Sequence, residues 1–357
     1  MSSNNQIELI LLLSKNRDAY PHQISKIALE ETHISWVILT GQFAYKIKKE
    51  LKFGQILDFS TLSLRKKICQ KEVEINKVLC GDMYIDVVKI VKQKNKRGEA
   101  GEGGDIKIVE LKNKGKALDY AVKMLEIPQK FRMDNLLKEG KVSSNTIDKI
   151  TSILVEFHRK TPTNRRIKKF GRPEFMMRKV EENFATLSKL TNINFKFERS
   201  LKSFINRKTD LFLERIQDDK IRDIHGDLYL KNVFIMPDGK FYLYDRIEFN
   251  DSLRYADIAE DVAHLAMDLD IYGRNDLSRR LISEYVLASR DTSLVNIVYF
   301  FMCYKACVRV KVSLFRARRL DDRGNNFEDD RKTIEQAEDE AKRHLQLAES
   351  YLELLER

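Results

Sequence analysis

One stretch decides how this chain folds: Ile224-His225-Gly226-Asp227-Leu228-Tyr229-Leu230-Lys231-Asn232. Asp227 offers a carboxylate that can take the proton of a hydroxyl group, and Asn232 offers a neutral amide oxygen five residues later. A further carboxylate, that of Asp245, follows thirteen residues after Asn232. Oxygen ligands of this kind suit Mg²⁺, and a positioned carboxylate suits a hydroxyl nucleophile. Together the three side chains indicate the transfer of a phosphoryl group to an alcohol.

The segment between Asn232 and Asp245 has the pattern of a hairpin. Residues 233–236 form a short apolar run, Pro237-Asp238-Gly239 is typical of a turn, and residues 241–244 form the returning strand. A hairpin of this size reverses the chain, so it can bring Asp245 back towards Asn232. We therefore predict that Asn232 and Asp245 are the protein ligands of one Mg²⁺ ion.

The spacing of Asp227 and Asn232 resembles the catalytic loop of protein kinases, in which four residues separate the Asp from the Asn. With His225-Gly226 before the aspartate, the chain resembles the aminoglycoside-phosphotransferase-like branch of the protein-kinase-like fold. The runs 244–251 and 257–261 narrow the likeness to poorly characterised members that are often fused to a P-loop ATP-binding domain. No Gly-x-x-x-x-Gly-Lys-Ser/Thr motif occurs here, so we expect that domain to be absent from this chain.

This resemblance implies an α+β, bilobal fold, with a small antiparallel-sheet N-lobe that has one main helix and a larger, mostly helical C-lobe. We place the nucleotide-clamping lobe at residues 1–125 and the lobe with the catalytic loop at residues 126–357. Among the helices expected after the boundary are single ones over residues 195–216 and 255–267. The charged, glycine-rich run 92–105 fits no dinucleotide motif and is expected to be a loop between strands.

The first strands of the chain are expected at residues 26–30, 34–39 and 43–51. In protein kinases the turn between the first two strands is rich in glycine and covers the nucleotide phosphates. Here that turn contains no glycine. Thr32, His33 or Ser35 could hydrogen-bond a phosphate instead, and a plain turn without any contact to the nucleotide is the alternative.

The third strand contains Ala44-Tyr45-Lys46-Ile47-Lys48, which is similar to the Ala-x-Lys of kinases, whose lysine binds the nucleotide phosphates. Strand alternation places Lys46 and Lys48 on the same face. Lys46 matches the kinase lysine by position, and Lys48 is the alternative. The resemblance further implies that Glu72, on a helix over residues 63–79, pairs with this lysine. It also implies that the backbone around Glu126 is the hinge that holds adenine.

For the catalytic loop, the resemblance implies that Asp227 is the catalytic base and that His225 beside it supports the geometry of the loop. Asp257 is expected to bond the backbone amides of the loop from the following helix. Glu248 could reach the surroundings of the metal or the substrate, and a surface position is the alternative. Residues that shape the acceptor pocket are expected on the C-terminal helices, among them Tyr304, Lys305 and Arg309.

The composition is that of a globular protein with a basic surface. The 357 residues include 65 Lys and Arg against 54 Asp and Glu, which gives a net charge of +11. This excess suits ATP and other anions, and it makes a nucleic-acid partner possible, although no nucleic-acid-binding motif supports one. No apolar run approaches the length of about 20 residues that a membrane span needs. The four cysteines show no disulfide pattern, so we expect a reducing cytoplasm.

We therefore expect an enzyme that uses ATP and Mg²⁺ to phosphorylate a hydroxyl group of a small molecule. Two alternatives remain open at this point. The basic composition favours a protein or RNA kinase, and the turn without glycine favours a nucleotide-binding regulatory module with weak catalysis or none.

Overall fold

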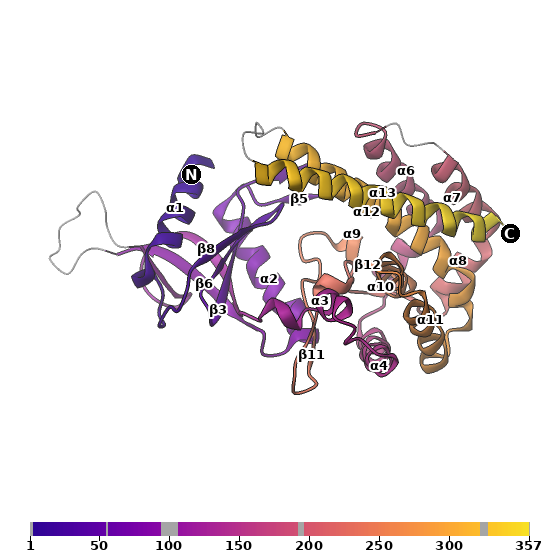
Figure 1. Ribbon diagram of the computed structural model, residues 1–357, viewed down its shortest axis with the longest axis horizontal. Coiled ribbons are helices and arrows are strands. Elements are labelled where there is room, and N and C mark those ends of the chain that lie inside the picture. Colours follow the sequence, from indigo (N-terminus) through magenta and orange to yellow (C-terminus); the bar gives the residue numbers. More distant parts are fainter. Residues whose placement is uncertain (1–2, 55, 94–105, 192–195, 322–327, 357) are drawn as a thin grey trace. The chain divides into compact units, whose positions relative to one another are not determined.

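The computed structural model describes residues 3–54, 56–93, 106–191, 196–321 and 328–356. The chain divides into two compact units (Figure 1). Unit 1 consists of Met1–Phe131 and Phe234–Asp251, and unit 2 consists of Arg132–Val233 and Ser252–Arg357. The hairpin that follows the catalytic loop therefore belongs to unit 1, whereas the division at residue 125 had grouped it with the rest of the C-terminal part. The reason is that its second strand packs against a helix of unit 1.

Unit 1 is built on a six-stranded antiparallel sheet with the order β1-β2-β3-β8-β6-β7. Its strands are β1 (Ala28–Glu31), β2 (Ser35–Leu39), β3 (Phe43–Lys48), β6 (Tyr84–Lys92), β7 (Ile106–Glu110) and β8 (Ala117–Leu125). A small pair, β4 (Lys52–Phe53) and β5 (Leu57–Asp58), lies outside this sheet. The run 92–105, expected to be a loop, lies from residue 94 onwards outside the described residues.

A helix covers each face of the sheet. Helix α1 (Ser3–Lys15) packs with one apolar cluster, and helix α2 (Leu62–Cys80) packs with another. Successive side chains of strand β3 point alternately towards these two clusters. Tyr45 and Ile47 are buried on the α1 side, and Ala44 is buried on the α2 side. This is the alternation that the sequence predicted.

Helix α2 begins and ends where the sequence indicates. Its N-cap is Thr61, whose hydroxyl accepts a hydrogen bond from the Leu64 amide at 3.2 Å. Gly81 closes the helix with φ of 43°, a backbone conformation that favours glycine. The expected helix over residues 63–79 therefore exists with nearly the same bounds.

The predicted hairpin is confirmed as strands β10 (Val233–Ile235) and β11 (Phe241–Leu243). Phe234 and Tyr242 from these strands are buried in the apolar cluster on the α2 side of the sheet. Gly239 in the connecting turn has φ of 84°, which favours glycine at this position. The hairpin thus places Asp245 next to the helix that carries Glu72.

Unit 2 is mostly helical. Its helices include α3 (Met133–Lys138), α4 (Ser144–Lys160), α5 (Arg165–Lys168), α6 (Pro173–Leu187), α7 (Lys196–Arg207), α8 (Thr209–Gln217), α9 (Asp251–Arg254, shared with unit 1), α10 (Ala259–Ile271), α11 (Asn275–Ser289), α12 (Val298–Asp321) and α13 (Glu328–Glu356). Helix α10 is buried from Ala259 to Leu269 and contacts α11, α12 and α13. It is the central helix of this unit.

Two expected helices differ from the structure. Residues 255–257 form strand β12 (Tyr255–Asp257), because they pair with strand β9 (Ile221–Asp223), and the helix begins only at Ala259. The helix expected over residues 195–216 is two helices, α7 and α8, which are separated at Lys208. Its first expected residue, 195, lies outside the described residues.

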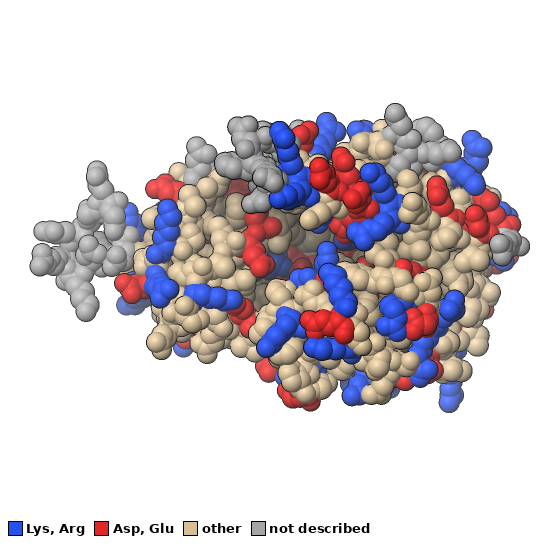
Figure 2. All heavy atoms as spheres, in the orientation of Figure 1, with Lys and Arg blue, Asp and Glu red and all other residues tan. Residues whose placement is uncertain are grey.

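The antiparallel sheet of unit 1 and the mostly helical unit 2 confirm the expected α+β class. All four cysteines are buried and free. Across the described ranges, no helix combines the length and the apolar character needed to cross a bilayer. On the face that Figure 2 shows, Lys and Arg side chains are interspersed with Asp and Glu rather than gathered into one basic patch.

Candidate active site

The predicted catalytic loop follows strand β9 in unit 2. The side chains of Ile224, Leu228 and Leu230 are completely buried and anchor the loop in the unit. Gly226 has φ of 88°, in the left-handed region that L side chains rarely adopt. The glycine of the His-Gly-Asp motif therefore has a conformational cause, and it allows the chain to turn immediately before Asp227.

Asp261, on the first turn of α10, fixes the backbone of this loop. Its carboxylate accepts hydrogen bonds from the amides of His225 (2.7 Å) and Gly226 (2.9 Å). The carboxylate also lies 3.1 Å from Nε2 of His158, whose Nδ1 is 2.7 Å from the hydroxyl of Tyr285. Burial alone would raise the pKa of Asp261, but His158, His225 and these amides outweigh it and hold the pKa below its ordinary value. The loop thus rests on a charged, hydrogen-bonded support.

The expectation that Asp257 bonds the loop amides is wrong. Asp257 instead accepts two hydrogen bonds from the buried guanidinium of Arg215, at 2.6 and 2.7 Å, and one from the Ala259 amide. Arg215 also pairs with Asp291. The sequence-based assignment failed because residues 255–257 form a strand, so that the helix that reaches the loop presents Asp261 to it.

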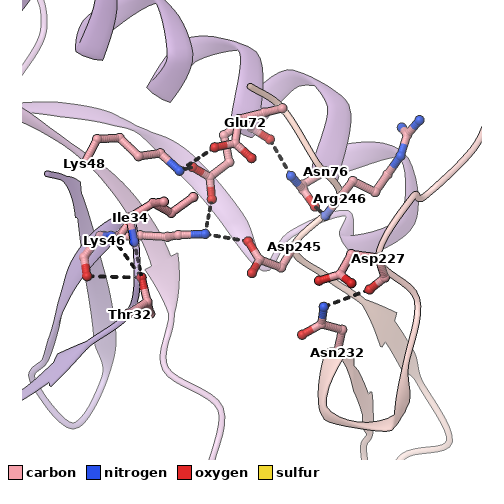
Figure 3. Close-up of polar contacts among 12 residues, drawn as sticks. Thr32, Ile34, Lys46, Lys48, Glu72, Asn76, Asp227, Asn232, Asp245 and Arg246 are labelled. Carbon is pink, nitrogen blue, oxygen red and sulfur yellow. Dashed lines mark hydrogen bonds and ion pairs between the residues drawn. The ribbon is translucent and has the colours of Figure 1, made fainter. Parts of the chain in front are cut away.

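Asn232 and Asp227 are joined within the loop. The side-chain amide of Asn232 donates from Nδ2 to the backbone carbonyl of Asp227 at 2.9 Å (Figure 3). Asn232 is buried, and this bond uses its nitrogen, which leaves the amide oxygen as the atom suited to a cation. The Asp227 side chain is 39% exposed, so its carboxylate is accessible to a small molecule.

A histidine that the sequence analysis did not single out lies beside Asp227. His264 of α10 is buried, and its Nδ1 is 3.8 Å from the Asp227 carboxylate. Its ring stacks on Tyr229 with centroids 5.6 Å apart, and neither ring nitrogen has a hydrogen-bond partner among the described residues. Burial, with Lys305 and Arg309 nearby, holds the pKa of His264 well below 6.5. His264 is therefore neutral at physiological pH.

The pH dependence of the unfolding free energy should reveal this buried neutral histidine. Unfolded histidine binds a proton near pH 6.5, whereas His264 in the native state does not, so the free energy of unfolding should fall as the pH drops below 6.5. The slope from one such group approaches about 1.4 kcal/mol per pH unit. His344, whose pKa burial lowers to about 4, acts in the same direction. Asp268 acts in the opposite direction below pH 6, because burial raises its pKa to about 6.

The contribution of His264 is isolated by comparing wild type with His264→Gln in chemical denaturation at pH 7.5, 6 and 5. We expect the difference in unfolding free energy between the two proteins to change steadily over this range in favour of the variant. His33→Gln, an exposed turn substitution, is the matched control and should show no such trend. A constant difference across the three pH values would contradict a buried neutral His264.

In unit 1, the predicted lysines converge on Glu72 (Figure 3). Lys46 lies 2.7 Å from one Glu72 oxygen and 2.5 Å from Asp245. Lys48 lies 2.6 Å from the other Glu72 oxygen and 2.6 Å from Glu248. The predicted pairing of the strand lysine with Glu72 is thus present in the geometry, and both lysines take part in it.

The two lysines differ in their access to solvent. The Lys48 side chain is 0% exposed and Glu248 is buried with it, so Glu248 does not lie on the surface. The Lys46 side chain is 10% exposed and its partner Asp245 is 39% exposed. Burial alone would lower the pKa of Lys46, but Asp245 and Glu72 raise it well above its ordinary value, so Lys46 is charged.

The backbone at Asp245 is held in an uncommon conformation. Asp245 has φ of 66°, which is rare outside glycine and is tolerated best by Asn and Asp. The Asp245 amide donates to the hydroxyl of Tyr84 at 3.2 Å, and the next amide, that of Arg246, donates to Asn76 at 2.8 Å. Residues in such conformations cluster at functional sites, where surrounding contacts hold them. Here helix α2 and strand β6 supply those contacts.

The side chains of the remaining predicted nucleotide contacts are hydrogen-bonded or buried within unit 1. The Thr32 hydroxyl accepts from the Ser35 amide at 2.9 Å, which closes the turn between β1 and β2. The Ser35 side chain is completely buried. The Glu126 carboxylate accepts from the Gly41 amide at 2.7 Å and pairs with Lys26, and the Glu126 amide donates to the Gln42 carbonyl. Phosphate contacts by Thr32 and Ser35 stay predictions.

The two predicted metal ligands belong to different units, Asn232 to unit 2 and Asp245 to unit 1. A Mg²⁺ ion shared by these two residues therefore stays a prediction. Over the residues that the structure describes, no three His, Cys, Asp or Glu side chains are grouped as metal ligands.

Sequence reasoning missed several residues that build these sites, namely Asn76, Tyr84, Asp261 and His264. Asn76 had a usable signal, because it lies four residues after Glu72 and so shares its helix face. Asp261 had one as well, since an acid in the first turn of a helix favours contacts with nearby amides. Tyr84 had none, because its role depends on a contact between segments far apart in the sequence.

No family model matches the chain. Among curated proteins, uncharacterised proteins of Mycobacterium tuberculosis and Mycobacterium bovis are 30% identical to it over 296 residues. These matches include 81% of this chain and 55% of each relative. The chain thus spans about half the length of the curated relatives it matches.

Several solved structures are similar to the chain at low sequence identity. A choline kinase from Cryptosporidium parvum has a TM-score of 0.49 and 11% identity, over 98% of this chain and 97% of that one. The GDP and kanamycin complex of APH(2")-IIia has a TM-score of 0.47 and 13% identity, over 95% and 98%. A thermostable variant of the aminoglycoside phosphotransferase APH(4)-Ia has a TM-score of 0.41 and 9% identity, over 92% and 95%.

Proposed function

We propose that the chain is an ATP- and Mg²⁺-dependent phosphotransferase that acts on a hydroxyl group of a small molecule. The observation that carries the proposal is the loop around Asp227. Its carboxylate is 39% exposed, while the backbone on both sides of it is held by Asp261 and Asn232. A carboxylate on a rigid, buried loop is what a general base needs, because its position is set before the substrate binds.

Asp227 would orient the acceptor hydroxyl and take its proton. The hydroxyl oxygen forms a new bond to the γ-phosphorus of ATP while the bond from that phosphorus to the bridging oxygen breaks, and ADP leaves with the electron pair. The proton passes to Asp227 and then to solvent. In this scheme His225 acts through its backbone amide, which donates to Asp261, and its side chain transfers no proton.

The residues present fit a divalent cation. In unit 1, two lysines face three carboxylates, those of Glu72, Asp245 and Glu248, so the cluster has one negative charge in surplus. Asn232 would add its amide oxygen, since its nitrogen already donates to the Asp227 carbonyl. When bound there, Mg²⁺ would supply positive charge that offsets the negative charge developing on the phosphates during transfer.

The nucleotide contacts are assigned to unit 1. Lys46 would bind the phosphates, since its ammonium group is partly exposed, and Glu72 would hold it in place. Lys48 is left as the buried partner of Glu248. Adenine would lie near the hinge, where Ile127 is part of the apolar cluster on the α2 side of the sheet.

A regulatory module that binds nucleotide without turnover is the second candidate. Two observations favour it. The Thr32 hydroxyl is engaged in its own turn rather than pointing to a ligand, and Lys46 is already paired with Asp245. Nucleotide binding by such a module would have to displace this ion pair.

The test is ADP formation by the purified protein with ATP and a panel of small alcohols. We expect ADP to form only when both Mg²⁺ and a suitable acceptor are present, and chelation of the metal to stop it. Calorimetry of nucleotide binding runs alongside. Nucleotide binding without acceptor-dependent ADP formation for any alcohol would reject the transferase in favour of the regulatory module.

A further inference from the structure

Polar residues on two packed helices surround Asp227 in unit 2. Glu260, His264 and Asp268 recur every four residues along one stripe of α10. Lys305 and Arg309, likewise four residues apart, lie on α12, which packs against α10. The two stripes place ionisable groups in the buried space next to the catalytic loop.

The first charged group in this space is a triad of two lysines and one carboxylate. Glu260 lies 2.7 Å from Lys179 and 3.2 Å from Lys305, and the three side chains are at most 11% exposed. Lys305 also donates to the backbone carbonyl of Gly226 at 3.2 Å, one residue before Asp227. One carboxylate here serves two ammonium groups.

In the second group one carboxylate likewise contacts two cations, of which Arg316 is 36% exposed. Glu340 lies 3.3 Å from Arg309 and 3.1 Å from Arg316. The Arg309 guanidinium covers the ring of Tyr229 at 4.7 Å, and Tyr229 stacks in turn on His264. Among the described residues, Glu340 accepts the one hydrogen bond that Arg309 donates. A guanidinium has five N–H donors, so most of those of Arg309 are available to a ligand.

Ion pairs alone do not satisfy the polar groups in this space. The carboxylates of Asp227, Glu340 and Asp268 all act on Arg309, so its charge is balanced. Its hydrogen-bond donors are less fully used, and neither ring nitrogen of His264 has a partner among the described residues. A buried polar group without a hydrogen bond is costly, and a ligand that accepts hydrogen bonds here would remove that cost.

We propose that Lys305, Arg309, His264 and Tyr229 form an anion seat for the acceptor. The acceptor would carry a phosphate or carboxylate group close to the hydroxyl group that is phosphorylated. Arg309 and Lys305 bind the anion, neutral His264 offers a ring nitrogen, and Asp227 faces the hydroxyl. This inference rests on the proposed function, and it makes amino alcohols and other cations poor acceptors.

Calorimetric titration without nucleotide tests the seat directly. The probes are glycerol 3-phosphate, glycerate, glycerol and ethanolamine, which share small alcohol frameworks and differ in charge. We expect at least one anionic probe to bind tenfold or more tightly than glycerol, and the preference between the two anions to distinguish phosphate from carboxylate. Ethanolamine should bind no better than glycerol. Tighter binding of ethanolamine, or no binding of either anion, would overturn the seat.

Variants of Arg309 test whether this residue binds the anionic group. Arg309→Gln should weaken binding of the preferred anion at least tenfold and leave glycerol unchanged, whereas the matched control Arg318→Ala, exposed on the same helix, should change neither. Arg309→Lys keeps the charge but loses the fork of donors and should give an intermediate loss. This variant decides the matter if the Gln variant does not fold. Anion affinity that is equal in wild type and the Lys variant would count against the seat.

ADP formation with the same four probes separates the two proposals. Anions that bind through Arg309 but are never phosphorylated would leave the seat standing and count against the transferase. Phosphorylation of a neutral or cationic alcohol at a rate that Arg309→Gln does not change would do the reverse.

Discussion

Asp227→Asn is expected to lower kcat by about 10²- to 10⁴-fold, the usual contribution of a general base. The substitution removes the proton acceptor but keeps the size of the side chain. The contacts that shape the loop involve the backbone of Asp227 and the amides before it, so they survive the change. The affinity for Mg²⁺ and ATP should stay within about threefold of wild type, because the proposed nucleotide contacts lie on other residues.

The measurement is kcat for ADP formation, together with calorimetric nucleotide binding. Asp210→Asn is the matched control, since Asp210 is an exposed aspartate on α8 of the same unit and should be neutral in both assays. Turnover by the Asp227 variant at the wild-type rate would reject the assignment of the base. A parallel loss of nucleotide binding would show that Asp227 acts on the fold of the loop instead.

Replacing Lys46 or Lys48 by Met should affect two different properties of the protein, ATP kinetics in the first case and stability in the second. Lys46→Met removes the partly exposed cation, so kcat/KM for ATP should fall by about 10²-fold or more, the size expected for a lost electrostatic contact in an active site. Lys48→Met leaves Glu248 buried without its partner. Breaking one side of a buried pair costs about 3–5 kcal/mol of stability, so this variant should unfold at markedly lower denaturant.

The two variants serve as each other's controls, because both lysines lie on β3 and contact Glu72. Chemical denaturation gives the unfolding free energy of each variant, and ATP kinetics give its kcat/KM. The assignment requires the larger kinetic loss in the Lys46 variant and the larger loss of stability in the Lys48 variant. The reverse pattern would make Lys48 the phosphate ligand, which is the alternative that the sequence left open.

The two units offer different groups to a ligand. In unit 1 the cluster around Glu72 has one carboxylate more than it has lysines, which favours a cation. In unit 2 the guanidinium of Arg309 has hydrogen-bond donors beyond the one that Glu340 accepts, which favours an anion. The net charge of +11 by itself said little about partners, because composition averages over such local differences.

Local sequence signals predicted the elements well where the interactions that stabilise them are local. The Pro237-Asp238-Gly239 turn and its flanking apolar runs predicted the hairpin, and the helix expected over residues 63–79 is found as α2. Alternation along β3 correctly placed Lys46 and Lys48 on one face. These features depend on backbone conformation and on neighbours a few residues away, and the sequence states both directly.

Only the tertiary structure decided which acid supports the catalytic loop, which lysine is accessible, and how charge is distributed beside Asp227. Asp261 rather than Asp257 reaches the loop because residues 255–257 pair with β9 across more than thirty residues of sequence. The accessibility of Lys46 and the burial of Lys48 depend on where Asp245 and Glu248 return to the sheet. By itself the sequence determined the elements and the chemical groups. Their pairing was decided by packing between distant segments, since burial and charge balance are properties of neighbours in space.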